Sequence, residues 1–337
     1  MTTGAPDFGS VIRLGYAYRE AKALLSAVEL GVFTALSGVA LDLAALRIKT
    51  GIDERGARDF FDALVALGLL ERDRHGRYSN APATAHFLDR NKPSYLGYEL
   101  EFINKKLYAS WDQLTDSLRT GRPQTQSDPS GPYASRYRDA EALTQFAAAM
   151  TAGTAAVARE LAARFPWHDY KSVTDVGCAE GCLPVQLALL HPHLVCGGFD
   201  LPPLEPVFDA YVARHNVAGR MTFYPGDFLL ADLPSADVLV LGRVLHNWDL
   251  ETKKRLLRKA YAALPKHGCL IVYERFIDDE RMSNATALLS SLNMLVMTPG
   301  GFDFTAADCC RWLEEEGFSN WRAEALTPDQ SMIVATK

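Results

Sequence analysis

The sequence lacks any run approaching the roughly 18 consecutive apolar residues of a membrane-spanning helix. Its beginning, MTTGAPDFGS, has neither the basic nor the apolar region of a secretory signal peptide. No cysteine precedes Cys178 and no Cys-x-x-Cys pair occurs, so nothing indicates a disulfide framework. These absences predict a cytoplasmic protein with no membrane partner, and they favour reduced thiols for its six cysteines.

An excess of positive charge is absent as well. The chain has 35 lysines and arginines against 41 acidic residues, which gives a formal net charge of −6. A net negative chain lacks the electrostatic attraction to phosphate backbones that drives nonspecific nucleic-acid binding. This balance disfavours nucleic acid as the principal partner and favours a small molecule.

The length and composition are those of an ordinary globular protein. With 337 residues, 48% of them hydrophobic and 23% charged, the chain is long enough for about two domains with buried cores. We expect a mainly α domain over residues 1–120, a linker and connecting helix over 121–165, and an α/β domain over 166–337.

The first of these segments shows helical periodicity and no parallel-sheet pattern. Between residues 41 and 80 the sequence predicts two short helices, the second begun by Asp53, and then a hairpin with its turn at His75–Gly76. Two helices followed by a two-stranded wing are typical of a winged-helix domain.

The second of the two short helices is a poor match to a DNA-reading helix. It carries Arg55 and Arg58, but four acidic residues lie between positions 53 and 62. Such a mixed surface does not attract phosphates. We therefore expect this domain to act as a packing or dimerisation module.

The pattern changes from residue 171 onward. A helix over 95–119, a loop over 122–132 and a helix over 138–165 are expected first, and short β-rich runs then alternate with helical segments. This alternation predicts a Rossmann-like doubly wound parallel sheet. The last two runs, WRAEALT and SMIVATK, predict an antiparallel hairpin at one edge of that sheet.

The first β-rich run ends in the small-residue turn Asp175-Val176-Gly177-Cys178-Ala179-Glu180-Gly181. Small residues let the backbone approach a ligand, and the next helix offers its N–H groups. Asp200 follows about 20 residues later, where a carboxylate can accept hydrogen bonds from both hydroxyls of a ribose. Asp227 ends the third run, from which it can reach an adenine amino group while Phe228 covers the ring. A tight turn with no ligand is the alternative.

On these residues the sequence resembles the class I S-adenosylmethionine-dependent methyltransferases. More narrowly, it is similar to small-molecule O-methyltransferases related to caffeic acid, acetylserotonin and bacterial natural-product tailoring enzymes. The turn above, FDLP at 199–202, GDF at 226–228 and LHNWD at 245–249 carry the resemblance, which covers nearly the whole chain. It implies S-adenosyl-L-methionine as cofactor, a Rossmann-like catalytic domain, a winged-helix dimerisation domain and a homodimer. The cofactor-binding residues that it implies are Asp175, Gly177, Ala179, Gly181, Asp200, Leu201, Asp227, Phe228 and Gly242.

The resemblance also implies the catalytic residues. His246 would be the general base for the acceptor hydroxyl, and a histidine with an ordinary pKa of about 6.5 suits the deprotonation of a phenol. Glu274 would orient His246, and Asp303 would be an accessory acid. Two positions depart from the family pattern. Ala179 stands where glycine is usual, and GGFDFT at 300–305 replaces G-G-x-E-R-T.

The acceptor is expected beside two helices of the second half. The substrate residues implied by the resemblance are Phe146, Met150, Asn293, Met294 and Met297. Phe304, which replaces the arginine of the family motif, is expected to add an apolar surface for a flat ring. His191 and His193 with Cys196 could form a metal cluster, but a turn into the second strand explains them better, so no metal is predicted.

The predicted activity is methyl transfer to a hydroxyl of a small aromatic natural-product acceptor. Three alternatives stay open. The altered GGFDFT segment motivates C-methylation of an activated ring, indole or keto-acid carbon. The wing motivates a ligand-sensing regulator, and the third alternative is a pseudoenzyme that binds the cofactor for structure.

Overall fold

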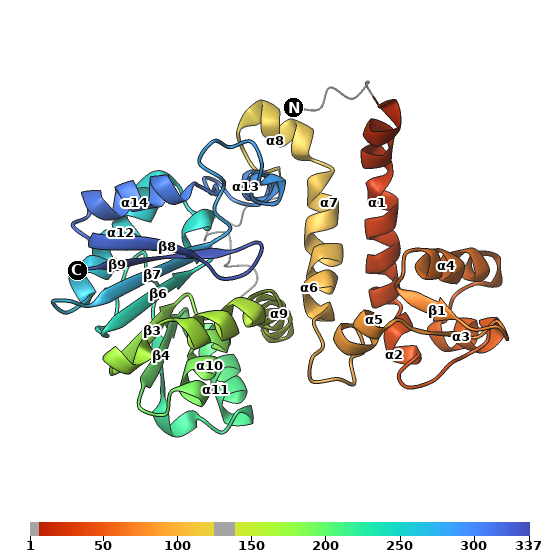
Figure 1. Cartoon of the computed structure of the whole chain (residues 1–337), viewed down its shortest axis with the longest axis horizontal. Coiled ribbons are helices and arrows are strands. Elements are labelled where there is room, and N and C mark those ends of the chain that lie inside the picture. Colours follow the sequence, from red (N-terminus) through yellow and green to blue (C-terminus); the bar gives the residue numbers. More distant parts are fainter. Residues whose placement is uncertain (1–6, 125–138) are drawn as a thin grey trace. The chain divides into compact units, whose positions relative to one another are not determined.

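The computed structural model describes residues 7–124 and 139–337 (Figure 1). The chain divides into two compact units, Met1–Tyr108 and Ala109–Lys337. Most of the predicted loop 122–132 lies outside the described residues. None of the helices within the described ranges is long and apolar enough to cross a membrane.

The first unit is mainly helical and contains the wing that the sequence predicts. Its elements are α1 (Phe8–Glu29), α2 (Val32–Ala35), α3 (Leu43–Thr50), α4 (Glu54–Ala66), β1 (Leu70–Arg72), β2 (Tyr78–Asn80), α5 (Pro82–Phe87) and α6 (Gly97–Phe102). The Asp53 carboxylate accepts a hydrogen bond from the Arg55 N–H at 3.0 Å and so caps α4. Gly76, with φ of 77°, turns the chain between the antiparallel strands β1 and β2. The winged-helix prediction is confirmed.

The helix predicted over residues 95–119 is confirmed only in part, because residues 97–111 are helical but a turn at 112–113 interrupts the helix. The chain forms α6, a π-helical turn (Ile103–Leu107), α7 (Tyr108–Trp111) and α8 (Leu114–Thr120). A π turn inserts one residue into the helical ring and shifts the faces that follow it. Here it holds Asn104, whose amide donates to Glu29 and accepts from Lys22 on α1, both at 2.6 Å. Long-range hydrogen bonds to α1 therefore accompany the π-helical turn.

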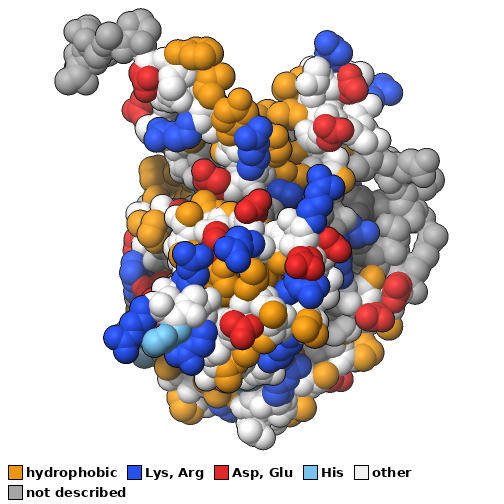
Figure 2. Space-filling view, turned by 90° about the vertical axis from the view of Figure 1, so that its right-hand side faces the viewer, with side chains coloured by type: hydrophobic (Ala, Val, Ile, Leu, Met, Phe, Trp, Pro, Cys, Tyr) orange, Lys and Arg blue, Asp and Glu red, His pale blue; other side chains and the backbone are white. Residues whose placement is uncertain are grey.

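Helix α1 exposes large apolar side chains over much of its surface. Leu14 is 78% exposed and Phe8 75% exposed, and the others are Val11, Ile12, Tyr16 and Tyr18. Figure 2 shows hydrophobic side chains gathered at the upper end of the molecule, where α1 begins. Extended apolar surfaces of this kind mark sites of protein association.

The second unit contains the α/β domain. Its elements after residue 139 are α9 (Ala140–Arg164), β3 (Ser172–Val176), α10 (Cys182–Leu190), β4 (Val195–Asp200), α11 (Glu205–Arg214), β5 (Met221–Pro225), β6 (Val238–Gly242), α12 (Leu250–Ala263), β7 (Cys269–Glu274), α13 (Ala285–Met297), α14 (Ala306–Glu315), β8 (Ser319–Ala325) and β9 (Ser331–Thr336). Helix α8 packs against α13, so the compact unit begins before the expected boundary at residue 120.

The strands of this unit form one sheet in the order β5-β4-β3-β6-β7-β9-β8 (Figure 1). The first five are parallel, and β9 runs antiparallel to both β7 and β8. This confirms the doubly wound sheet and the C-terminal hairpin at its edge. The strand order reverses at β3, and at such a switch point the carboxyl ends of the strands open a crevice for ligands.

Helices cover both faces of the sheet. Along β6, Val238 and Val240 belong to one hydrophobic cluster and Leu239 and Leu241 to the other, as alternation of side chains requires. Residues of α9, α10 and α11 complete the first cluster, and residues of α12 and α14 complete the second. The two buried faces fix the register of the strands and hence the positions of the loops at their ends.

Candidate active site

Three strand ends bring the predicted site residues to one edge of the sheet. The turn 177–181 follows β3, and a short 3-10 turn, Leu245–Asn247, follows its parallel neighbour β6. The next strand, β7, ends at Glu274. Because parallel strands end at the same edge, the predicted cofactor loop and the predicted base lie on the same side of the fold.

The turn after β3 has the backbone of a ligand-binding loop. Gly177 and Gly181 have φ of 81° and 89°, which side chains other than glycine rarely adopt. A Cβ atom at Gly181 would also lie 2.6 Å from the ring of Phe208. Ala179 has φ of 49° and therefore keeps the left-handed conformation at the cost of strain against its methyl group.

Asp200 lies next to this turn, at the end of β4. Its Oδ2 accepts a hydrogen bond from the Ala179 N–H at 2.8 Å, and its Oδ1 accepts one from the Leu201 N–H at 2.8 Å. Burial raises the pKa of Asp200 to about 6, and the two N–H donors oppose that rise. Each carboxylate oxygen still has a lone pair for a further donor. The prediction that Asp200 binds a ribose fits this arrangement.

The sequence predicted Asp175 in the turn, but Asp175 lies inside β3. Its side chain is 6% exposed, and burial together with the charge of Asp200 raises its pKa to about 7. The strand extends to Val176 because Asp175 pairs with Gly198 of β4 and Val240 of β6. Asp175 is therefore a buried residue of the strand that leads into the turn 177–181.

Asp227 and Phe228 follow β5, as predicted. The Asp227 Oδ1 accepts from the Leu229 N–H at 2.8 Å, and the ring of Phe228 packs edge-on against Trp248 with centroids 5.7 Å apart. Trp248 therefore packs against the residue that follows Asp227. Gly242 ends β6, where a Cβ atom would lie 2.0 Å from the ring of Tyr273. Ligand contacts of these residues stay predictions.

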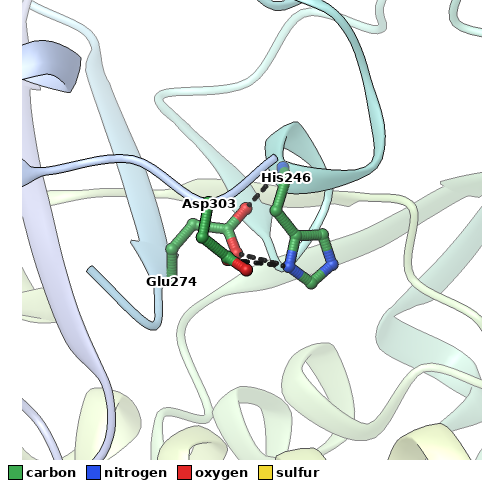
Figure 3. A group of neighbouring side chains, drawn as sticks. All are labelled: His246, Glu274 and Asp303. Atoms are coloured by element: carbon green, nitrogen blue, oxygen red, sulfur yellow. Dashed lines mark hydrogen bonds and ion pairs between the residues drawn. The ribbon is translucent and has the colours of Figure 1, made fainter. Parts of the chain in front are cut away.

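His246 lies between two buried carboxylates. Its Nδ1 is 3.3 Å from the Asp303 Oδ1 and 3.4 Å from the Glu274 Oε2, and its backbone N–H donates to the Glu274 Oε1 at 3.3 Å. Figure 3 shows both carboxylates facing the same ring nitrogen, while the other ring nitrogen points away from them. The predicted base and its two acids are thus brought together, and Glu274, 1% exposed, is no surface charge.

This geometry sets the tautomer of His246. Carboxylates accept hydrogen bonds, so Nδ1 carries the proton and Nε2 keeps a free lone pair. Burial raises the pKa of Glu274; the charge of His246 lowers it, and the charge of Asp303 raises it further. The group is therefore an imidazole oriented by acids, with its basic nitrogen directed away from them.

The glycine pair at 300–301 explains how Asp303 reaches His246 although an aspartate side chain is shorter than that of glutamate. A Cβ atom at Gly301 would lie 2.6 Å from the His246 carbonyl oxygen, so the loop passes against the turn that holds the base. The Ser291 hydroxyl of α13 accepts a hydrogen bond from the Asp303 N–H at 3.1 Å. The close approach of the loop thus compensates for the missing methylene.

Two sequence comparisons identify the family. The O-methyltransferase domain matches residues 111–319, and the O-methyltransferase dimerisation domain matches residues 12–90. The chain belongs to the O-methyltransferase family. The tetracenomycin polyketide synthesis 8-O-methyl transferase of Streptomyces glaucescens is 41% identical to this O-methyltransferase over 329 residues, 98% of this chain and 96% of that protein.

Two further proteins are similar over nearly the whole chain. The N,N-dimethyltransferase OxyT of Streptomyces rimosus is 36% identical over 332 residues, 97% of this chain and 96% of that protein. The crystal structure of human N-acetylserotonin methyltransferase in complex with S-adenosylmethionine matches with a TM-score of 0.90 at 26% identity, covering 100% of this chain and 99% of that one. The predicted family and fold are confirmed.

In this O-methyltransferase the predicted acceptor residues lie on α9 and α13. Helix α13 contacts the turn that carries His246. Asn293 accepts a hydrogen bond from the Trp111 indole N–H at 2.9 Å, which fixes its amide with the NH₂ group directed elsewhere. Met294 is buried, whereas the remaining three are half-buried: Phe146, Met150 and Met297. Their contact with an acceptor stays a prediction.

Phe304 does not provide the apolar acceptor surface expected from the sequence. It is 2% exposed, and its ring packs against Trp312 and Phe276 at centroid distances of 4.9 and 5.7 Å. The backbone N–H of Ile277 donates to the Phe304 carbonyl and draws the residue into the core beside β7. Phe304 is therefore a core residue of the second hydrophobic cluster.

The metal question concerns two clusters. His191 and His193 each bond a backbone carbonyl, of Ala162 at 2.7 Å and of Trp167 at 3.0 Å, which accounts for both imidazoles without an ion. Among the described residues, the one group of three or more His, Cys, Asp or Glu side chains within reach of a single ion is His246, Glu274 and Asp303, whose nitrogen and oxygen atoms lie within 4.8 Å of one another.

Sequence reasoning missed Lys253. This lysine of α12 is 0% exposed and lies on the buried stripe of that helix with Leu256, Leu257 and Ala260. Its spacing from those residues is three, four and seven, which is the apolar face of an amphipathic helix. A lysine at such a position is the signal that could have found it.

Proposed function

We propose that this O-methyltransferase transfers the methyl group of S-adenosylmethionine to a hydroxyl of a small aromatic acceptor, with His246 as general base. The observation that carries the proposal is the geometry of His246, whose Nδ1 faces two buried carboxylates while Nε2 stays available for a proton. The 41% identical relative named as an 8-O-methyl transferase of tetracenomycin polyketide synthesis supports an aromatic hydroxyl as the acceptor.

The cofactor would be held at the ends of β3, β4 and β5. The turn 177–181 leaves its backbone close to the crevice, and the buried carboxylate of Asp200 has acceptor capacity for ribose hydroxyls. Asp227 and Phe228 would bind the adenine, Leu201 would pack beside the ribose, and Gly242 would line the site. When bound, the cofactor supplies a methyl group on a positively charged sulfur that an oxygen nucleophile can attack in line.

His246 would take the proton of the acceptor hydroxyl at Nε2. The resulting imidazolium is stabilised by Glu274 and Asp303, since charge interactions inside a buried site are stronger than in water. The two acids also hold the ring in one orientation, so that Nε2 faces the acceptor throughout the reaction. This division of work makes His246 the catalytic residue and the two acids its supports.

We further propose a homodimer in the cytoplasm, with α1 in the dimer contact. The match to a dimerisation domain over residues 12–90 and the exposed apolar side chains of α1 support the dimer. All six cysteines are buried and free, which supports a reducing compartment. The Arg72 side chain of the wing is bonded to Asp62 at 2.6 Å rather than free to bind a phosphate, which weighs against a DNA-binding regulator.

The test of the catalytic proposal is His246→Ala. We expect the rate of methyl transfer to fall by about 100-fold or more, since a general base contributes about 10² to 10⁴. The affinity for S-adenosylhomocysteine, measured by calorimetry, should stay near that of the wild type because Asp200 and the turn are untouched. His168→Gln, at a histidine whose side chain is 79% exposed, is the matched control. A near-normal rate of His246→Ala would remove His246 from the chemistry.

The acceptor atom is tested separately, because the relative OxyT is named an N,N-dimethyltransferase. Products made with ¹³C-labelled methyl and read by NMR distinguish attachment to oxygen, nitrogen and carbon. We expect oxygen. The altered GGFDFT segment no longer favours C-methylation, because Asp303 reaches His246 despite its shorter side chain. A carbon-bound label would contradict the proposed function, as would no transfer at all to a broad panel of acceptors.

A further inference from the structure

Lys253 is a buried cation with no carboxylate directly bonded to it. Its side chain is 0% exposed, although lysine is almost never fully buried without a charged partner. Its Nζ donates to the Trp248 carbonyl at 2.5 Å and lies 3.3 Å from the centroid of the Phe302 ring and 5.3 Å from that of Phe304. In the described part of the chain, no ion pair or hydrogen bond joins Nζ to an acid, so local pairing does not explain its burial.

The acid pair Glu274 and Asp303, in contrast, has too few hydrogen-bond donors and too little positive charge around it. The single Nδ1–H of His246 is shared between two carboxylates, and it bonds fully to one of them at a time. The Glu274 Oε2 and the Asp303 Oδ2 are buried without a hydrogen-bond donor in the described chain. With a neutral imidazole, the two carboxylates place two negative charges in a dry site, which is costly unless a cation lies near.

We propose that Lys253 is a positioning residue whose buried ammonium balances the charge of the acid pair and thereby keeps Nε2 of His246 unprotonated before the reaction. This inference rests on the proposed function of His246 as base. The charges of Lys253, Glu274, Asp303 and a protonated His246 sum to zero. With Lys253 in place, the site therefore becomes neutral when the base takes the proton, and it carries a single negative charge beforehand.

The methyl-transfer step makes one bond, breaks one bond and moves one proton. The acceptor oxygen forms a bond to the methyl carbon, and the carbon–sulfur bond breaks with its electron pair remaining on sulfur. The hydroxyl proton passes to Nε2 of His246. Without Lys253, the resting site would carry two negative charges and would bind a proton on Nε2 before the acceptor arrives. A base that is already protonated cannot act.

The groups whose charges act on Lys253 come from several elements. They are Glu274 at the end of β7, Asp303 in the loop before α14, Asp249 before α12 and the Cys309 thiol on α14. Burial lowers the pKa of Lys253 to about 8, and the charges of Glu274, Asp303 and Asp249 oppose that change. The ammonium is therefore still protonated at neutral pH, where the base must be free.

The position of Lys253 also bears on the altered GGFDFT segment. The family motif to which this segment corresponds has an arginine where Phe304 stands, and here that ring lies buried 5.3 Å from the lysine Nζ. A buried positive charge is thus present next to the rings of Phe302 and Phe304, which flank Asp303 in the sequence, but it comes from α12 instead of from the loop.

The experiment is the pH dependence of kcat and kcat/KM for Lys253→Met and Lys253→Arg. Loss of the charge should move the acidic limb of kcat/KM to higher pH by about one unit, because charges interact strongly in a buried site. At pH 6 the rate of Lys253→Met should be about tenfold lower than that of the wild type, and it should recover by about pH 9. Lys253→Arg should keep the limb near its wild-type position.

The neighbouring residue offers the control. Lys254 on the same helix pairs with Glu315 at 2.5 Å and does not contact the acids, so Lys254→Met should leave the pH profile unchanged. A merely structural role of Lys253 would lower the rate of Lys253→Met equally at all pH values or lower its melting temperature without moving the limb. Either result would overturn the proposal.

A double variant covers the case in which Lys253→Met fails to fold. Lys253→Met with Asp303→Asn removes one positive and one negative charge, so charge balance predicts a folded protein whose acidic limb returns toward the wild type. A double variant that remains unfolded, or whose limb stays shifted, would count against the proposal. If His246→Ala is inactive and the limb does not move, the inference about Lys253 fails alone; if His246→Ala is active, the proposed function fails with it.

Discussion

The decisive contact at the scale of single residues is that between one ring nitrogen and two carboxylates. A histidine alone can present either nitrogen to a substrate, and its tautomer follows from what the other nitrogen meets. Here Glu274 and Asp303 both meet Nδ1, so the basic lone pair is on Nε2. The family resemblance predicted all three members.

Ala179 has a backbone conformation that favours glycine, and the strain of this conformation can be tested. Its φ of 49° is strained for alanine and unstrained for glycine. We expect Ala179→Gly to raise the free energy of unfolding by about 0.5 to 1 kcal/mol, as relief of that strain outweighs the added entropy of the unfolded chain. Urea denaturation measures it.

The matched control for this prediction is the same substitution in a helix. Ala213→Gly, at an exposed position of α11, should lower the free energy of unfolding by about 1 kcal/mol. If both variants are destabilised to the same extent, the backbone at Ala179 is not strained in solution.

At the scale of elements, the neighbouring strands β3 and β4 carry two buried acids at the cofactor end of the sheet. Asp175 and Asp200 have pKa values raised to about 7 and about 6, in both cases first by burial. A carboxyl whose pKa is higher in the folded than in the unfolded state binds protons more tightly when folded. Its contribution to stability is therefore present at low pH and is lost as the pH rises toward the folded pKa.

Asp175→Asn should remove the loss of stability that Asp175 causes as the pH rises. Between about pH 4 and pH 7 the wild type should become less stable through Asp175, and the variant should not. At pH 8, without cofactor, we expect the variant to be more stable than the wild type by on the order of 1 kcal/mol or more, and the gain to shrink toward pH 4. Chemical denaturation at several pH values provides the measurement.

Asp232→Asn, at an exposed aspartate, serves as the control and should change stability by the same small amount at every pH. A gain from Asp175→Asn that does not depend on pH would show that Asp175 is charged to the same degree in the folded and unfolded chain. In that case burial would not have raised the pKa of Asp175.

At the scale of the whole molecule, α1 is a helix whose apolar side chains the single chain leaves exposed to solvent. Six large apolar side chains of this helix are exposed, and the matched dimerisation domain includes most of the helix. We expect Val11→Lys combined with Leu14→Lys to convert a dimer into a monomer, since a charged ammonium cannot be buried in an apolar contact without a partner. Sedimentation velocity at micromolar concentration detects the change.

Ile48→Lys is the control for this prediction. Ile48 is 73% exposed on α3 and belongs to a different helix of the same unit. The dimer should persist in this variant. A wild type that sediments as a monomer, or a double α1 variant that remains dimeric, would show that α1 is not the dimer contact.

The sequence by itself determined the fold class and the order of most elements, and its family resemblance predicted His246, Glu274 and Asp303, which the fold brings together. Periodicity and turn residues act locally, and in a parallel sheet they also fix the edge at which each strand ends. Tertiary structure decided the rest. It buried Phe304, placed Asp175 within β3, formed a π-helical turn at Asn104 and enclosed Lys253. These outcomes depend on contacts between residues far apart in the chain, such as His246 and Asp303, 57 positions apart, which no local pattern specifies.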